Sequence, residues 1–389
     1  MIALLPLDDR PCNVRFPQQI AAIGGTQLVT PPYEVLGLFN TPGQPEALQS
    51  WIEELPRLEA LIVSVDMLAY GGLVASRRPR VAVEQALANL NILRAFRAAR
   101  PETPVYAFNI LMRLAITMDS DAAVSNYYNI MRYARLVDEA ERFDSAHLRE
   151  ELAKVTAQIP PAILEEYLAA RLRNHTVNGC MIDWLAEGVF DYLLITQEDA
   201  TEFGLHRREQ DALLKYAAER EVQSKMSLHP GADEAALTLL ARHWNTGVSF
   251  RVQWSNLEDA HRIAPFEDRP YDEALVQHVA AMRGELLGEG DESTADFQLF
   301  VNAPVGGSQK DEEDGARALR AARLMPFVHS LEEAANNNET IALCDVAFPN
   351  GADNVLMTEL ERRGLLGKIA AFGGWNTAGN TTGTVLAQC

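Results

Sequence analysis

Short apolar runs recur along the chain, and most of them stop at a cluster of aspartate, asparagine, glycine or arginine. Their length and composition are typical of buried β-strands. The runs are Ile2–Leu7, Ala60–Val65, Val105–Phe108, Tyr192–Thr196, Lys225–Leu228, Val248–Gln253, Phe297–Val301, Ile341–Cys344 and Ile369–Phe372. Helical segments lie between many of these runs, which indicates parallel strands that are each followed by a helix. The loops at the carboxyl ends of such strands open on one face, so the polar clusters are expected to converge on one pocket.

This alternation predicts an α/β fold, with residues 1–389 as a single α/β catalytic domain. Residues 119–187 depart from the pattern, because their apolar residues recur every three to four positions, and they are expected to form a helical insertion in one β/α loop. A TIM-like (β/α) barrel is slightly favoured, since polar clusters follow nearly every strand. A doubly wound parallel sheet is the alternative, although it concentrates its ligand groups at one switch point.

The charge balance narrows the class of partner. The chain carries a formal net charge of −20 and has no lysine- or arginine-rich run, so a nucleic acid or an anionic membrane would be repelled. We expect a small-molecule or saccharide substrate instead. Neither a Gly-x-Gly-x-x-Gly loop nor a Walker-type lysine loop follows a strand, and dinucleotide and triphosphate binding therefore lack support.

The cysteines and the first residues both predict a cytoplasmic protein. The four cysteines lie far apart, which is neither a zinc signature nor a disulfide framework. The chain starts directly with a strand-like run, without a leader-like segment before it, and no later run reaches membrane-spanning length.

Three carboxyl groups are the predicted catalytic residues: Glu198, Asp199 and Asp66. Glu198 and Asp199 are adjacent after an apolar run, so one can donate a proton to a leaving group while the other stabilises a developing cation. A helix cap is the alternative role, which Gly204 weakens because it interrupts the chain before the next helix. Asp66 ends another strand, where an acid needs a partner or a ligand; holding backbone amides is its alternative role.

Polar residues after the first three strands are predicted to bind substrate. Gly71 and Gly72 would let a ligand approach the backbone closely. Asp8 or Asp9 could instead cap the next turn and pair with Arg10. The predicted substrate-binding residues of this region are Asp8, Asp9, Arg10, Tyr70, Asn109 and Arg113.

The later clusters add further predicted substrate contacts. Trp375 lies in a glycine- and asparagine-rich segment that resembles a sugar-binding platform, because an aromatic ring stacks on the apolar face of a sugar while amides bond its hydroxyls. A tight turn with Trp375 packed inside is the alternative. The predicted substrate-binding residues of this part are His229, Asp233, Asp345, Trp375, Asn376 and Asn380.

The spacing of the histidines gives little support to a dedicated zinc site. The eight histidines are dispersed, with neither a His-x-x-x-His pair nor His-Glu-x-x-His, and we predict no metal ligands. An oxygen-rich site for Mg²⁺ or Mn²⁺ stays open as an alternative, and its candidate ligands are Asp8, Asp66, Glu198 and Asp345.

Three motifs carry a resemblance to a known family. They are Pro6-Leu7-Asp8-Asp9-Arg10-Pro11, Asp66-Met67-Leu68-Ala69-Tyr70-Gly71-Gly72-Leu73-Val74-Ala75-Ser76-Arg77, and Gly374-Trp375-Asn376-Thr377 with Asn380 and Gly383. Together they resemble the bacterial family described as domain of unknown function 4127, over essentially the whole chain. The family description implies no activity. Its pattern has two aspartates where this chain has Glu198 and Asp199, a difference that keeps the carboxylate chemistry.

An analogy of arrangement supplies the functional expectation. Adjacent carboxylates after a mid-chain strand are similar to those of substrate-assisted N-acetylhexosaminidases, in which the acetamido group of the substrate is the nucleophile. Asp199 would then be the general acid and Glu198 would orient the acetamide, or the reverse. We therefore expect a hydrolase of the glycosidase type; a divalent-metal-dependent hydrolase or lyase and a non-catalytic sugar- or metabolite-binding protein are the alternatives.

Overall fold

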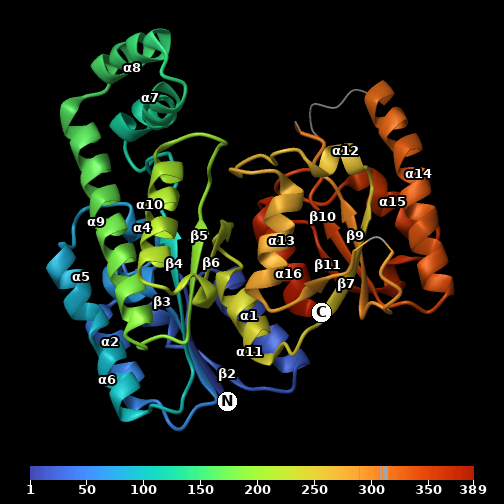
Figure 1. The fold of residues 1–389 in the computed structure, drawn as a ribbon, viewed down its shortest axis with the longest axis horizontal. Helices are drawn as coiled ribbons and strands as arrows, with labels where there is room; N and C mark the ends of the chain where they lie inside the picture. Colours follow the sequence, from blue (N-terminus) through green and yellow to red (C-terminus); the bar gives the residue numbers. More distant parts are fainter. Residues whose placement is uncertain (289, 307–308, 310–313) are drawn as a thin grey trace. The chain divides into compact units, whose positions relative to one another are not determined.

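The computed structural model describes residues 1–288, 290–306, 309 and 314–389 and contains two compact units, Met1–Leu228 and His229–Cys389 (Figure 1). We refer to them as unit 1 and unit 2. The sequence predicts a single domain over residues 1–389, and the structure gives each unit a parallel sheet and hydrophobic clusters of its own. The predicted α/β class is confirmed.

The first sheet has the strand order β2-β1-β3-β4-β5-β6. Its strands are β1 (Ile2–Leu5), β2 (Leu28–Val29), β3 (Ala60–Ser64), β4 (Val105–Leu111), β5 (Tyr192–Gln197) and β6 (Met226–Pro230), and the boundary between the units falls within β6. Strands β1, β3, β4 and β5 are buried at every residue, as expected for parallel strands covered on both faces. Continuous burial explains why these strands appear in the sequence as unbroken apolar runs.

Helices cover one face of this sheet and share a hydrophobic cluster with it. Alternate strand residues such as Leu61 and Val63 point into that cluster, together with Leu48, Leu90 and Leu185 from the helices. The helices of this region are α1 (Pro11–Ile23), α2 (Pro45–Glu54), α3 (Val65–Tyr70), α4 (Leu73–Ser76), α5 (Val83–Leu90), α6 (Ile92–Ala99) and α10 (Leu205–Glu219).

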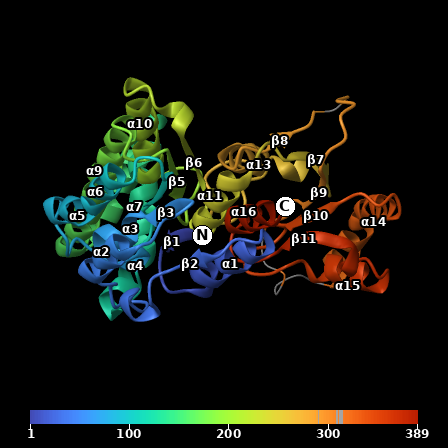
Figure 2. The same ribbon diagram turned by 90° about the horizontal axis from the view of Figure 1, so that it is seen from below.

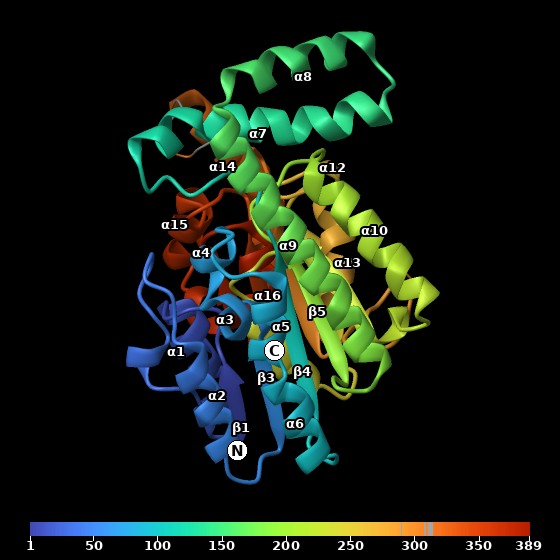
Figure 3. The same ribbon diagram turned by 90° about the vertical axis from the view of Figure 1, so that its left-hand side faces the viewer.

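The predicted helical insertion at residues 119–187 is formed by three helices between β4 and β5. They are α7 (Asp121–Arg142), α8 (Ala146–Gln158) and α9 (Pro161–Ala186). Ser120 and Ser145 accept hydrogen bonds from backbone amides at the starts of α7 and α8, and Pro161 begins α9. Figure 3 shows α7 and α8 lying side by side, with α9 running back along the sheet.

The second sheet has the order β11-β10-β9-β7-β8 and lies between two helical layers. Its elements are α11 (Ala235–Trp244), β7 (Ser249–Trp254), α12 (Leu257–Ala260), α13 (Tyr271–Ala281), β8 (Glu285–Leu286), β9 (Phe297–Asn302), α14 (Asp314–Asn336), β10 (Ile341–Asp345), α15 (Asn354–Arg362), β11 (Ile369–Gly373) and α16 (Ala378–Gln388). Leu299 and Ala342 face α13 and α16, whereas Phe300, Ile341 and Leu343 face α14 and α15. Figure 2 shows α14 and α15 side by side.

Both sheets are open, with β2 and β6 at the edges of the first and β11 and β8 at the edges of the second. This arrangement is consistent with the doubly wound alternative, and the closed barrel that the sequence slightly favours is not what the described strands form. The presence of polar residues after nearly every strand does not distinguish a barrel from an open sheet. Several of these residues form hydrogen bonds with nearby residues of the protein, as Asp8 and Asp345 do. No helix in the described part of the chain combines the length and the apolar character needed to cross a bilayer.

Candidate functional site

A buried carboxyl group lies at the carboxyl end of β3. Asp66 is in the first turn of α3, which follows β3 without a loop, and it is 3% exposed. Its Oδ2 accepts a hydrogen bond of 2.8 Å from the backbone amide of Ile110. Burial raises the pKa of Asp66 to about 7; the nearby charge of Glu198 raises it further, while the Ile110 amide and the charge of Arg173 oppose the rise. Asp66 can therefore gain or lose a proton near neutral pH.

The predicted pair Glu198 and Asp199 follows β5, in the sheet position next to β4. Glu198 is buried, and its Oε1 forms an ion pair with Arg77, while its Oε2 has no hydrogen-bond partner among the described residues. The side chain of Asp199 is 41% exposed and lies 3.5 Å from Nη1 of Arg113. The two neighbours thus differ in environment, and Glu198 rather than Asp199 belongs to the buried cluster with Asp66. We call Asp66, Glu198 and Arg77 the carboxyl centre.

Two of the predicted substrate-binding residues are held by the insertion helix α9. The guanidinium of Arg173 lies over the ring of Tyr70, 4.1 Å from its centroid, and Nδ2 of Asn109 donates to Oδ1 of Asn178 at 2.9 Å. Burial raises the pKa of Tyr70 well above its ordinary value. Asn109 lies inside β4 rather than after it. Helix α9 of the insertion therefore contacts Tyr70 and Asn109, and the charge of its Arg173 acts on Asp66.

The first motif, around Asp8, is partly accounted for by local bonding. Asp8 accepts hydrogen bonds from Nε of Arg10 at 2.9 Å and from Nδ2 of Asn13 at 2.7 Å, which matches the local pairing considered in the sequence analysis. Asp9 and Arg10 line a hollow of about 140 Å³ together with Gly71 and Gly72. Gly71 and Gly72 have φ of 91° and 114°, a conformation that favours glycine. A substrate contact at this hollow stays a prediction.

Unit 2 contains a second cluster of buried ionisable groups. His229 and Glu234 come from the end of β6 and the start of α11, and His278 comes from α13; they are at most 1% exposed. The imidazole rings of His229 and His278 have centroids 3.9 Å apart, and Nδ1 of His229 lies 3.8 Å from Oε1 of Glu234. We call these three residues the histidine centre. The sequence places His229 among substrate contacts and gives no role to His278.

Burial also shifts the protonation of the histidine centre. It lowers the pKa of His229 to about 4 and that of His278 well below its ordinary value, and it raises the pKa of Glu234 to about 8 with help from the charges of Asp233 and Glu267. Both imidazoles are consequently neutral at pH 7.

The third family motif holds the loop that carries the histidine centre. Oδ1 of Asn380 accepts from the backbone amides of Ala232 and Asp233, at 3.1 and 2.9 Å, and Nδ2 of Asn376 donates to Oδ2 of Asp233 at 3.0 Å. The indole Nε1 of Trp375 donates to Oγ1 of Thr384 at 3.2 Å. Trp375 is half-buried, and its contact with a sugar stays a prediction, as do those of Asn376 and Asn380, whose Nδ2 and Oδ1 respectively bond to the protein itself.

Glycines of the same motif allow this close packing. A Cβ built on Gly383 would lie 2.2 Å from Cγ of Glu234, and one on Gly379 would lie 2.7 Å from the carbonyl oxygen of Pro230. Helix α16 can therefore approach the loop only because these positions lack side chains.

Asp345 belongs to a separate network at the end of β10. Its oxygens accept from Nδ2 of Asn302 at 2.9 Å and from the backbone amide of Asp353 at 2.6 Å. Asp353 in turn forms an ion pair with Arg320 and caps α15. Burial raises the pKa of Asp345 to about 7. The proposed Mg²⁺ or Mn²⁺ ligand set is thereby divided, because Asp345 is in unit 2 and the other three candidates are in unit 1.

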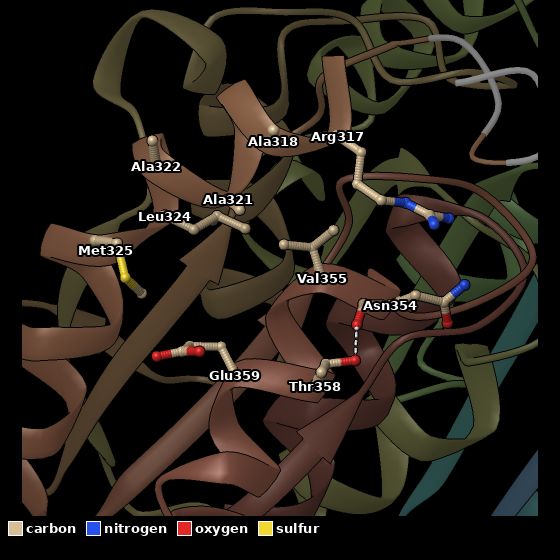
Figure 4. A pocket seen from close by; sticks show the side chains of 10 residues that line it. All are labelled: Arg317, Ala318, Ala321, Ala322, Leu324, Met325, Asn354, Val355, Thr358 and Glu359. Carbon is tan, nitrogen blue, oxygen red and sulfur yellow. Dashed lines mark hydrogen bonds between the residues drawn. The ribbon is translucent and has the colours of Figure 1, made fainter. Parts of the chain in front are cut away.

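A larger hollow of about 640 Å³ lies between α14 and α15 (Figure 4). Its lining is mainly apolar, with Leu324, Met325 and Val355 around it and Arg317 and Glu359 at its margins. None of the predicted site residues lines it. The residues that line this hollow form no cluster of ionisable or nucleophilic side chains, and the hollow therefore does not indicate a reaction.

The predicted site residues thus fall into two groups, one in each unit. The carboxyl centre collects Asp66 and Glu198, and unit 2 contains His229, Asp233, Asp345, Trp375, Asn376 and Asn380. Sequence reasoning missed Arg77 and His278. Arg77 stands in the second family motif and could have been noticed there, whereas nothing in the local sequence connects His278 with His229.

The fold and these centres define a parallel α/β protein with two sheets and a buried cluster of ionisable groups in each unit. The chain belongs to the family described as protein of unknown function (DUF4127), whose model matches residues 2–389, and this confirms the resemblance seen in the three motifs. Comparison with curated proteins and with solved structures finds no significant match.

Proposed function

We propose that the protein is a hydrolase of the glycosidase type, with Asp66 as the proton donor and Glu198 as the charged partner. The observation that carries this proposal is a buried acid beside an incompletely bonded carboxylate: burial raises the pKa of Asp66 to about 7, and the nearby Glu198 has an Oε2 without a hydrogen-bond partner among the described residues. A carboxyl group that is half protonated at neutral pH suits general acid catalysis, because its proton is available and its transfer is not strongly uphill.

Glu198 supports the proposal by its different environment. Its Oε1 forms an ion pair with Arg77, and its Oε2 lacks a hydrogen-bond partner among the residues that the structure describes. A fixed carboxylate of this kind can stabilise the positive charge that develops on a sugar ring when the glycosidic bond breaks. The proposal therefore moves the acid role from Asp199, which is half exposed, to Asp66.

Asp199 and Arg113 are left with a binding role. They lie 3.5 Å apart and both follow strands that neighbour each other in the sheet, so a substrate hydroxyl can donate to Asp199 and a hydroxyl or carbonyl oxygen can accept from Arg113. The proposal that the substrate is N-acetylated rests on the analogy between the adjacent carboxylates Glu198 and Asp199 and those of N-acetylhexosaminidases. Its test is the comparison of N-acetylated with unmodified sugars.

The experiment is a screen of the purified chain against nitrophenyl and alkyl glycosides, including N-acetylglucosaminides and N-acetylgalactosaminides. The variant Asp66→Asn is expected to lose about 10²- to 10⁴-fold in kcat/KM, more with alkyl than with nitrophenyl leaving groups, because a poor leaving group depends more on the acid. Asp211→Asn is the matched control, since Asp211 is an exposed aspartate of the same unit whose side chain pairs with Arg142 at 2.9 Å.

The competing functions have separate signatures in this screen. Turnover that disappears with a chelator but survives in Asp66→Asn would favour a metal-dependent hydrolase or lyase. Thermal stabilisation by a sugar without product, in both the wild type and Asp66→Asn, would favour a binding protein. Full turnover by Asp66→Asn on alkyl glycosides would contradict the proposed role of Asp66.

A further inference from the structure

We propose that His229, Glu234 and His278 bind a divalent transition-metal ion in unit 2. Each residue offers one ligand atom, and the three atoms lie within 4.8 Å of one another; among the described residues this is the one group of three or more such side chains that is close enough. The residues come from the end of β6, the start of α11 and the last turn of α13, so only the folded chain brings them together. The proposal is independent of Asp66 and of the hydrolase activity.

The hydrogen bonds of the centre leave the ligand atoms available. Nδ1 of His229 bonds to the carbonyl oxygen of Pro230 at 2.9 Å, and Oε2 of Glu234 accepts from the backbone amide of Ala232 at 2.8 Å. Nε2 of His229 and Oε1 of Glu234 have no hydrogen-bond partner within the described part of the chain. A histidine that binds a metal commonly donates its second ring N–H to a backbone carbonyl, which fixes the ring and leaves the other nitrogen for the ion.

The burial of Nε2 of His229 and Oε1 of Glu234 makes their lack of hydrogen-bond partners in the described chain an argument for a bound ligand. Buried polar atoms in folded proteins nearly always have partners, because a buried group without a partner loses its hydrogen bonds to water and gains none in return. His229 and Glu234 are 0% exposed and His278 is 1% exposed, so bulk water is not a partner for their side chains. A bound cation would satisfy the orphaned atoms of Glu234 and His229 together.

The surrounding chain holds the ligands in place. Asn380 bonds to the backbone amides of Ala232 and Asp233, between the two ligands of the loop, and Gly383 lets α16 pack directly on Glu234. This supports the ligands in the way that surrounding hydrogen bonds support known metal sites. The third family motif thereby acquires a role in building the centre.

The donor set decides the class of ion. Two imidazoles and one carboxylate suit Zn²⁺, Fe²⁺, Co²⁺ or Ni²⁺, whereas Mg²⁺ and Ca²⁺ prefer oxygen ligands. Three protein ligands leave at least one coordination position for water or another ligand.

The test measures metal binding by the full-length chain. Metal content is determined by mass spectrometry on protein as purified, and the metal-depleted chain is then titrated with Co²⁺, followed by its visible absorption, and with Zn²⁺ and Mg²⁺ by calorimetry. We expect about one Co²⁺ or Zn²⁺ per chain and no comparable Mg²⁺ binding. His278→Gln and His229→Gln are each expected to weaken Co²⁺ binding at least about tenfold, because loss of a mere hydrogen-bond partner of a ligand already weakens metal binding by about 10- to 100-fold.

The matched control is His261→Gln, because His261 is an exposed histidine of unit 2 that pairs with Asp272 at 2.7 Å. It should bind Co²⁺ as the wild type does. Near-ultraviolet circular dichroism checks that each variant is folded, and Asp66→Asn should keep the full metal stoichiometry even if it has no hydrolase activity.

Two results would overturn the proposal. One is a folded wild-type chain that takes up no Co²⁺ or Zn²⁺ at stoichiometric concentration. The other is binding that is unchanged in both His229→Gln and His278→Gln, which would place any ion elsewhere on the chain.

Discussion

The two units bury the same chemical group in different surroundings. Asp66 in unit 1 and Asp345 in unit 2 each have a pKa raised to about 7, chiefly by burial. The oxygens of Asp345 are bonded by Asn302 and by the amide of Asp353, and Asp353 is itself paired with Arg320. These hydrogen bonds hold Asp345 in a structural network and oppose the rise of its pKa, which burial and the charge of Asp353 cause. A perturbed pKa alone does not identify a reactive group.

Asp66 differs because its neighbours are incompletely bonded. One oxygen of Asp66 accepts from Ile110, and the nearby carboxylate of Glu198 keeps Oε2 without a hydrogen bond in the described chain. The comparison teaches that the bonds left open around a buried acid are the better guide to chemistry. Four variants test how far this contrast between the units holds.

The largest effect is expected for Arg77→Met, which removes the ion-pair partner of buried Glu198. A buried carboxylate without its partner costs about 3–5 kcal/mol of unfolding free energy. Arg78→Met is the adjacent control, because Arg78 pairs with Asp119 and Glu166 nearer the surface, and it should cost about 1 kcal/mol or less. Urea unfolding measures both, and equal losses would show that Glu198 is not a buried charge.

The second prediction concerns the pH dependence of stability. The pKa of Asp66 is about 7 in the folded state and 3.8 in the unfolded reference, so the folded state holds the proton more tightly and its stability falls as pH rises from about 4 to about 7. A shift of this size corresponds to about 4 kcal/mol. Asp66→Asn should remove this loss and be more stable than the wild type at pH 8. Parallel stability–pH curves for the two proteins would contradict the assignment.

The third prediction applies to the packing of unit 2. Gly383→Ala places a methyl group against Glu234, and such overpacking costs about 1–3 kcal/mol. Gly367→Ala is the control, because a Cβ at Gly367 meets no atom within 4 Å, and it should change the unfolding free energy by less than about 0.5 kcal/mol. Thermal unfolding distinguishes them, and a stable Gly383→Ala variant would mean that α16 can move away from the loop.

The smallest effect is expected for Trp375→Phe. It removes the hydrogen bond from the indole Nε1 to Thr384 and should cost about 1 kcal/mol. The sugar-platform interpretation makes the opposite prediction, namely an unchanged stability with weaker sugar binding. Chemical unfolding and calorimetric titration with N-acetylglucosamine therefore separate the two roles of Trp375.

Much of the fold could be predicted from the sequence, because buried parallel strands leave continuous apolar runs. The run at Ala60–Val65 corresponds to β3 at Ala60–Ser64, and the run at Tyr192–Thr196 corresponds to β5 at Tyr192–Gln197. Strands β2 and β8 have two residues each, and so short a strand produces no recognisable pattern. Whether the sheet closes or stays open depends on strand order, which the period of a strand does not encode.

The site was harder to predict, because its contacts join distant parts of the chain. Glu198 was recognised from its place after a strand, but Arg77 reaches it from the end of α4, and only its place in the second family motif pointed to it. His278 meets His229 only because α13 packs in the same unit, and the spacing of the two histidines has no metal-binding pattern. Nδ2 of Asn376 and Oδ1 of Asn380 bond to the protein itself, and a substrate contact through the other polar atom of each amide stays a prediction.

The insertion between β4 and β5 also determines how the first sheet can assemble. β4 ends at Leu111 and β5 begins at Tyr192, yet the two are paired along most of their length. Their pairing must close a long loop, whose entropic cost grows with the logarithm of its length, and such non-local contacts slow folding. Helices α7 and α8 lie against each other within that loop and can form early, which shortens the span still to be closed. The joining of β4 to β5, and with it the meeting of Asp66 and Glu198, is therefore expected late in folding.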